Sequence, residues 1–262
     1  RHVSSIGRFP SLSSSSFARP GLAKLEHVLY TLGMPAKNRI KTYEAGAYYH
    51  IYNRGVAKRP VFVDDQDFGV FLSYCKTYLL PKDSTALQDI LASDASSKEK
   101  DKALKLLRMN NFADTVKLLA YCLMSNHFHM LVYQKEAENI DQFMNSLGTR
   151  YAMYFNKKYK RVGPLFQGVY KAVRITSEEQ LLYLTKYIHR NPDPDNGKVF
   201  QTYPYSSYVV YRGLSHASWI ESGSVLGILS KKNQYKKYQE FVEERRDFEE
   251  MAATLKDLVV DL

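Results

Sequence analysis

The stretch YCLMSNHFHMLVY, residues 121–133, decides the fold of this chain. Two apolar runs flank the pair Ser125-Asn126, which is typical of a two-residue turn between antiparallel strands. We therefore predict a β-hairpin made of VKLLAYCLM and HFHMLVYQ. Because side chains alternate between the two faces of a strand, His127 and His129 share one face, about 7 Å apart at Cα, while Phe128 points into the core.

Two imidazoles this close have two interpretations. Together they can bind one divalent ion, or they can form a partly exposed pair that is satisfied by hydrogen bonds. A single H-x-H sequence is common, so the two residues alone leave both interpretations open. Elsewhere in the chain, we interpret His50 as a structural histidine near the pair and assign His189 no catalytic role.

The elements around the hairpin follow from periodicity and capping signals. The helix that starts after Ser177 has Gln180 in position for a capping box, and Pro192 ends it. The other predicted elements are a strand at 47–55, a helix at 64–80, a helix at 138–160 and a strand within 163–175. This order predicts an α+β fold in which one antiparallel sheet carries helices on one face.

Composition limits the class of protein. The 262 residues suggest one large domain with extensions, and the net charge of +10 favours a polyanionic partner, nucleic acid first. No apolar run approaches the roughly 20 residues that span a bilayer, so we expect no membrane association. Two cysteines are too few for a disulfide framework, which suits a reducing cytoplasm.

We predict the following organisation. Residues 1–33 are a Ser-rich upstream or tag-like segment, an interpretation that we favour over an organellar transit peptide. Residues 34–212 form the main domain. Within that domain, residues 82–116 are charged, and we interpret them as a helical insertion with SSKEKDKALKLLRMNNF as one exposed helix. Residues 213–262 are a charged helical extension at the C-terminus.

A second pair of polar residues lies in YLTKYIHRNP, residues 183–192. Tyr187 and Asn191 are four residues apart and so share one face of a helix. A tyrosine at the boundary of an amphipathic helix and an asparagine before a proline are both ordinary. The residues by themselves therefore favour a structural role for this pair.

Five segments taken together resemble a known family. In order, they are YHIYNRG, LMSNHFHMLV, SLGTRYAMYFNKKYKRVGPLFQGVYKAVRI, YLTKYIHRNP and YPYSSYVVY. The series resembles the single-tyrosine HUH transposases, in particular the branch of REP-associated tyrosine transposases, over roughly residues 43–212. The resemblance implies a fold of the RRM or ferredoxin-like type, the HUH sandwich.

The resemblance also implies a chemistry. His127, His129 and Asn191 would hold a divalent metal, Mg²⁺ or Mn²⁺, and Tyr187 would be the nucleophile. Many relatives have Gln where this chain has Asn191. The substrate would be single-stranded DNA beside a hairpin, cleaved and rejoined through a 5′-phosphotyrosine link. It further implies a cytoplasmic, nucleoid-associated protein of bacterial or archaeal type, and some members of the family act as dimers.

A candidate DNA-binding surface lies in residues 150–174, which contain seven basic residues and no acidic one. Basic groups for phosphates with interleaved aromatics for bases are typical of single-strand binding. The aromatic candidates are Tyr154, Tyr159, Phe166 and Tyr170, whereas we expect Tyr151 and Phe155 in the core. The basic candidates are Lys157, Lys158, Lys160, Arg161, Lys171 and Arg174, with Arg54 after the first strand.

Three functions remain at this point. The first is a metal-dependent enzyme that cleaves and rejoins single-stranded DNA. The second is a protein of the same fold that binds hairpin DNA without cleaving it. The third is a metal-dependent phosphodiesterase that uses water instead of tyrosine, which leaves the matching positions of Tyr187 and Asn191 as a coincidence.

Overall fold

A computed structural model of the chain describes residues 43–193 and 198–244. The predicted segment at 1–33 and the end of the C-terminal extension lie outside these residues. The elements are β1 (Tyr48–Arg54), η1 (Val56–Lys58), α2 (Asp65–Leu79), α3 (Ser84–Ala92), α4 (Ser97–Arg108), β2 (Val116–Met124), β3 (His127–Gln134), α5 (Asn139–Lys158), β4 (Lys171–Ile175), α6 (Glu178–Arg190), η2 (Val199–Gln201), α7 (Tyr208–Tyr211), α8 (Gly223–Leu229) and α9 (Gln234–Glu243).

The predicted hairpin is confirmed. Strands β2 and β3 pair antiparallel on either side of Ser125 and Asn126, and the four-stranded antiparallel sheet has the order β2-β3-β1-β4. The turn is held from the neighbouring strand, because Gly55 donates its backbone N–H to the Asn126 carbonyl at 2.8 Å. Gly55 cannot be replaced freely, since a Cβ there would lie 2.0 Å from the Arg59 carbonyl oxygen.

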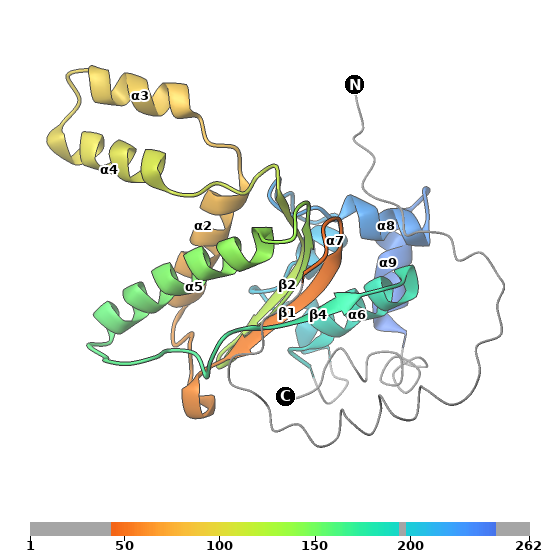
Figure 1. Ribbon diagram of the computed structural model, residues 1–262. Coiled ribbons are helices and arrows are strands. Elements are labelled where there is room, and N and C mark those ends of the chain that lie inside the picture. The colour runs from red at the N-terminus through yellow and green to blue at the C-terminus, as the bar shows by residue number, and fades with distance from the viewer. Residues whose placement is uncertain (1–42, 194–197, 245–262) are drawn as a thin grey trace, which may run out of the picture. The chain divides into compact units, whose positions relative to one another are not determined.

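Helices α2 and α5 cover one face of the sheet (Figure 1). Phe128 points toward them, with its ring centroid 5.5 Å from that of Phe71 in α2. In α5, Tyr151 is buried and donates its hydroxyl to the Val61 carbonyl at 2.6 Å, and Phe155 is buried as well. The predicted core positions of these two α5 residues are therefore confirmed.

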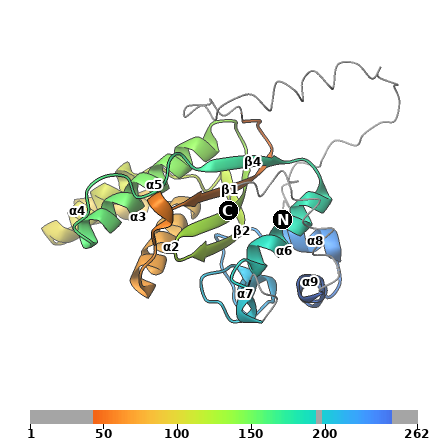
Figure 2. The ribbon, with the colours of Figure 1, turned by 90° about the horizontal axis from the view of Figure 1, so that it is seen from below.

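Helix α6 packs against β2 and β3 from the opposite face, as Figure 2 shows with the sheet between α5 and α6. The expectation of helices on one face is right for α2 and α5 and wrong for α6. The physical reason is visible in β2, where every residue from Leu118 to Leu123 is buried. A strand that is buried on both sides needs cover on both faces, and its apolar run does not alternate.

The charged segment at 82–116 forms two helices, α3 and α4, ahead of β2. Sequence reasoning expected one exposed helix here, and α4 is that helix. It begins with a capping box in which Ser96 and Glu99 bond each other's backbone N–H. Helix α3 was not expected; it begins at Asp83, whose side chain accepts a hydrogen bond from Ala86 N.

No helix in residues 43–193 and 198–244 is long and apolar enough to cross a membrane.

Candidate active site

His129 lies at the centre of the sheet and is completely buried. In the register of β3 with β1 it is opposite Tyr52, and its ring stacks on the Tyr52 ring at 5.9 Å between centroids. Its Nδ1 lies 2.9 Å from Nε2 of His50, which is also completely buried. Its Nε2 is buried and has no hydrogen-bond partner among the described residues.

His127 shares the face of His129, as predicted, and the two ring centroids are 5.2 Å apart. Its Nδ1 lies 2.6 Å from the Asn126 side-chain oxygen, and its Nε2 lies 3.1 Å from Oδ1 of Asn191. A neutral histidine has one N–H and can donate to only one of these oxygens. The other contact then brings two lone pairs together, which is the arrangement that a cation between them would stabilise.

Helix α6 brings its own two candidates to the same place. It begins at Ser177, whose hydroxyl accepts a hydrogen bond from Gln180 N at 3.1 Å. Ten residues after that cap, the half-buried ring of Tyr187 meets the His129 ring edge-on at 5.4 Å between centroids. Asn191, one turn later, contacts His127. The four residues that sequence reasoning placed in one site are therefore together in the structure.

Comparison with known families matches residues 95–191 to the family described as "Transposase IS200 like". The chain is therefore similar to the IS200-like transposases over these residues. The matched range begins inside the predicted insertion and ends at Asn191, so it contains both histidines and Tyr187 but not His50.

Among solved structures, the chain is similar to a REP-associated tyrosine transposase that was solved bound to a REP hairpin. The two share 12% sequence identity with a TM-score of 0.37, over 71% of this chain and 98% of that chain. A likeness at this TM-score supports no conclusion about function. A comparison with curated protein sequences finds no match.

Within the IS200-like region, burial keeps the histidines neutral. Burial lowers the pKa of His129 well below its usual value, and the neighbouring His50 and His127 add to the effect. Burial likewise lowers the pKa of His127; the Asn191 contact opposes this, and the charge of Arg54 reinforces it. Neutral imidazoles are the form that binds metal.

The pKa of Tyr187 is shifted upward, whereas the pKa values of the histidines are shifted downward. Burial raises the pKa of its hydroxyl above 10, while a hydrogen bond with the Asn191 side chain lowers it in part. The phenol of the unliganded protein is therefore protonated at neutral pH. Any reaction at its oxygen has to include loss of that proton.

The side chains fit a metal ion. The candidate donors are Nε2 of His127, Nε2 of His129 and Oδ1 of Asn191, two imidazole nitrogens and one amide oxygen. The observation that directly favours a metal ion is Nε2 of His129, which is buried and has no hydrogen-bond partner among the described residues. Buried polar atoms usually have a partner. In the described part of the chain no three His, Cys, Asp or Glu side chains are grouped to hold a metal. Oδ1 of Asn191, which contacts Nε2 of His127, is the candidate for a third ligand.

The far side of α6 is bound by the C-terminal part of the same chain. His189 lies 2.7 Å from the hydroxyl of Tyr238 in α9 and 2.8 Å from that of Ser207. Lys186 donates to the Glu244 carbonyl at 3.0 Å, and Arg190 donates to the Val242 carbonyl at 3.1 Å. These contacts give His189 a structural role, and they fix the helix that carries Tyr187.

The predicted DNA-binding residues separate into groups. Arg54 and Lys171 are on the same face of the sheet as the histidines, because Arg54 is opposite His127 and Lys171 is opposite Tyr52 in the strand register. Arg174 is on the other face and pairs with Glu44. The remaining basic residues follow the end of α5 and its loop, and of these Lys157 and Lys160 are exposed and Arg161 is half-buried.

Lys158 is engaged within the fold. Its Nζ lies 2.7 Å from a carboxylate oxygen of Asp64 and 2.8 Å from one of Asp67. Asp67 also accepts hydrogen bonds from Tyr154 at 3.0 Å and Tyr159 at 2.8 Å. These two tyrosines, predicted as base-stacking groups, therefore join α5 to the start of α2.

Two further residues support the site. Sequence reasoning placed His50 near the pair as a structural histidine, and His50 contacts Nδ1 of His129 from the neighbouring strand. Sequence reasoning assigned Asn126 only to the turn, although the Asn126 side chain also contacts His127. The one available signal was the alternation of His50 with Tyr52 in β1, which sets the face but not the partner.

Proposed function

We propose that this chain cleaves and rejoins single-stranded DNA through attack of Tyr187 on a backbone phosphate. The observation that carries the proposal is the convergence of Tyr187 and Asn191 from α6 with His127 and His129 from β3. The match of residues 95–191 to the IS200-like transposase family supports it. The resemblance of the five sequence segments favours DNA next to a hairpin as the substrate.

In the proposed cleavage step, the Tyr187 oxygen forms a bond to phosphorus while the bond to the 3′ oxygen breaks. The phenol loses its proton, and the departing 3′ oxygen gains one to become a hydroxyl. The 5′ phosphate stays on Tyr187 as a phosphodiester. Attack of a 3′-hydroxyl on that link releases Tyr187 and joins the strands, so the bond energy is conserved and no ATP is needed.

His127, His129 and Asn191 are the residues that would hold Mg²⁺ or Mn²⁺. Such an ion supplies charge neutralisation at the scissile phosphate and stabilises the leaving oxygen. The imidazole ligands suit Mn²⁺ better than Mg²⁺. The protein's own contribution is to keep both histidines neutral and to hold Tyr187 against His129, so that its oxygen is positioned before DNA binds.

The test is a denaturing gel of the protein with labelled hairpin DNA and Mn²⁺. We expect a slow-migrating covalent adduct that disappears with EDTA and with Tyr187→Phe, while DNA binding by that variant persists. Tyr183→Phe is the matched control, because Tyr183 is one turn earlier on α6 and contacts Phe241 instead of the histidines.

Each other outcome identifies a different function. An adduct with Tyr187→Phe at the wild-type level rules out Tyr187 as the nucleophile. Cleaved DNA without any covalent species indicates a phosphodiesterase that uses water. Tight hairpin binding without cleavage under any metal condition indicates a DNA-binding protein of the same fold.

A further inference from the structure

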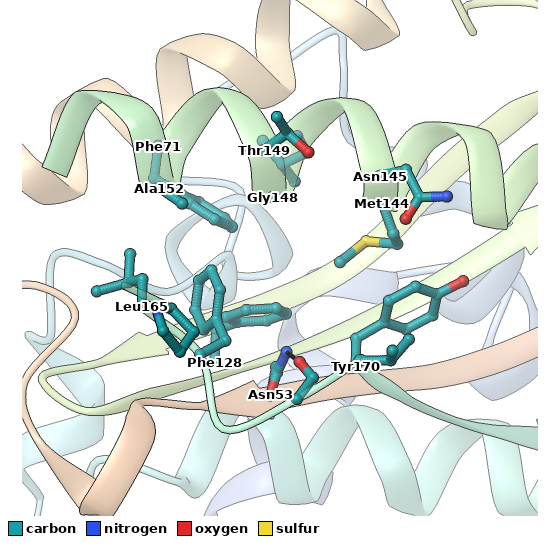
Figure 3. Close-up of a pocket in the computed structure, with 15 residues that line it drawn as sticks. Asn53, Phe71, Phe128, Met144, Asn145, Gly148, Thr149, Ala152, Leu165 and Tyr170 are labelled. Atoms are coloured by element: carbon teal, nitrogen blue, oxygen red, sulfur yellow. Dashed lines mark hydrogen bonds between the residues drawn. The ribbon is translucent and has the colours of Figure 1, made fainter. Parts of the chain in front are cut away.

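A cleft of about 470 Å³ opens between α5 and the sheet, on the face opposite His127 and His129 (Figure 3). Its volume is within the range of sites that bind small molecules. Phe128, which separates the two histidines in β3, forms part of its floor. The loop from α5 to β4 closes one side, with the Phe166 ring edge-on to Phe128 at 5.8 Å between centroids.

The walls are largely apolar, and Phe166 is the one aromatic lining residue that is only half-buried. The lining residues are mostly apolar, and four of them are aromatic: Phe71, Phe128, Phe166 and Tyr170. Among the lining residues, Val169 is 65% exposed. Base stacking on aromatic side chains is the main way in which proteins bind unpaired nucleotides.

Gly148 keeps the cleft open from the α5 side. A glycine inside a helix costs roughly 1 kcal/mol relative to alanine. A Cβ at Gly148 would meet no atom within 4 Å, so the packing of the protein does not require glycine there. The absent side chain leaves space that a ligand can fill, between Asn145 and Ala152 in Figure 3.

Two polar side chains face the same space from α5. Asn145 and Thr149 are exposed, one helical turn apart, and both line the cleft. Neither side chain hydrogen-bonds another residue in the part of the chain that the structure describes. An amide and a hydroxyl can donate to and accept from the edge of a base.

The basic residues near the cleft are fewer than its sequence range contains. Residues 142–177 supply twelve of the fifteen lining residues and contain no Asp or Glu and seven Lys or Arg. Lys158 and Arg174 pair with carboxylates and Lys171 is on the other face of the sheet, whereas Lys157, Lys160 and Arg161 remain to attract an anionic ligand. Asp141, just before this range, accepts a hydrogen bond from the lining residue Tyr170. The cleft and the candidate active site are close to each other along β1. Asn53 lines the cleft, and the next residue, Arg54, is opposite His127 in β3. A ring with an attached phosphate satisfies both the apolar walls and this charge.

We propose that this cleft binds one unpaired nucleobase of the single-stranded DNA substrate, next to the nucleotide at the active site. The proposal rests on the proposed function. One strand would then contact both faces of the sheet near the same edge, with its phosphates on the basic residues and one base between α5 and Phe128.

The test compares how tightly the protein binds two labelled ligands in metal-free buffer. One is a mixed pool of single-stranded 12-mers, and the other is an abasic strand of 12 residues with the same charge. Gly148→Leu fills the cleft and replaces a poor helix former by a good one, so the melting temperature of this variant should not fall. We expect it to bind the base-containing pool roughly tenfold more weakly, the loss of one stacked base. Its affinity for the abasic strand should stay that of the wild type.

Gly69→Leu is the matched control, because Gly69 is also helical, in α2, with no atom within 4 Å of a Cβ and no place in the cleft. The proposal is overturned if Gly148→Leu binds both strands as the wild type does, or weakens both equally. If the wild type still forms the Tyr187 adduct, the proposed function survives that result. A wild type that binds no single-stranded DNA overturns both.

Discussion

Nε2 of His50 lies 2.9 Å from Nδ1 of His129, across the β1–β3 pairing and with both rings completely buried. If Nδ1 of His129 donates its hydrogen to His50, Nε2 of His129 keeps its lone pair. That nitrogen is the one without a partner in the described residues. In that arrangement His50 would act as a positioning residue, selecting the tautomer of His129 that can bind the proposed metal.

The first prediction concerns metal affinity. His50→Ala should weaken Mn²⁺ binding about 10- to 100-fold, the usual effect of removing the partner of a metal-bound histidine. His50→Gln should recover part of the loss because its amide can still accept the hydrogen bond. Calorimetric titration with Mn²⁺ measures both, and His216→Ala, at an exposed histidine, is the control. Unchanged Mn²⁺ affinity in a folded His50→Ala protein contradicts this role.

The second prediction concerns whether one chain builds a complete site. Because α6 is bound on its far side by Tyr238, Val242 and Glu244 of its own chain, we expect Tyr187 to act on DNA held by the same protein molecule. Mixing Tyr187→Phe with His129→Ala should then restore no covalent adduct. Adduct recovery in the mixture would mean that α6 is exchanged between two subunits of a dimer.

The third prediction compares two basic residues of β4. Lys171 is on the face of the histidines, whereas Arg174 is on the other face and pairs with Glu44. Lys171→Gln should weaken single-stranded DNA binding and reduce the slope of log affinity against log salt by about 0.7, the loss of one phosphate contact. Arg174→Gln should change both less. Fluorescence anisotropy at several salt concentrations measures the two slopes, and equal effects would remove the distinction between the faces.

The fourth prediction concerns acid stability. Burial works against the charge of Asp67, but the hydrogen bonds from Lys158, Val63 N, Tyr159 and Tyr154 outweigh it and hold the pKa of Asp67 below 3.8. A carboxyl with a lowered pKa stabilises the fold above its unfolded pKa, so this contribution should be lost as the pH falls below about 4.

Asp67→Asn tests that prediction. It should lower the free energy of unfolding at pH 7 by roughly 1–3 kcal/mol, because an amide has one accepting oxygen for the hydrogen bonds that Asp67 accepts, while Lys158 keeps its ion pair with Asp64. It should also flatten the loss of stability below pH 4. Urea unfolding at several pH values measures both effects, and Asp101→Asn, at an exposed carboxylate, should change neither. An acid limb in Asp67→Asn as steep as that of the wild type would contradict the assignment.

Local signals determined much of this fold. The turn at Ser125 and Asn126 and the start of α6 at Ser177 depend on neighbours in the chain, so the sequence alone predicts them. The alternation of a strand also determined that His127 and His129 share a face. Helical spacing did the same for Tyr187 and Asn191.

The tertiary structure decided which residues and elements these faces contact. Whether α6 covers the second face of the sheet depends on burial of β2 from both sides, which periodicity cannot distinguish from other buried segments. His50 reaches His129 from 79 residues away, and Asp64 binds Lys158 from 94 residues away. Such contacts depend on strand order and helix packing. The sequence can therefore propose that a basic residue binds DNA or that a histidine binds metal, but only the folded structure determines which residue each of them contacts.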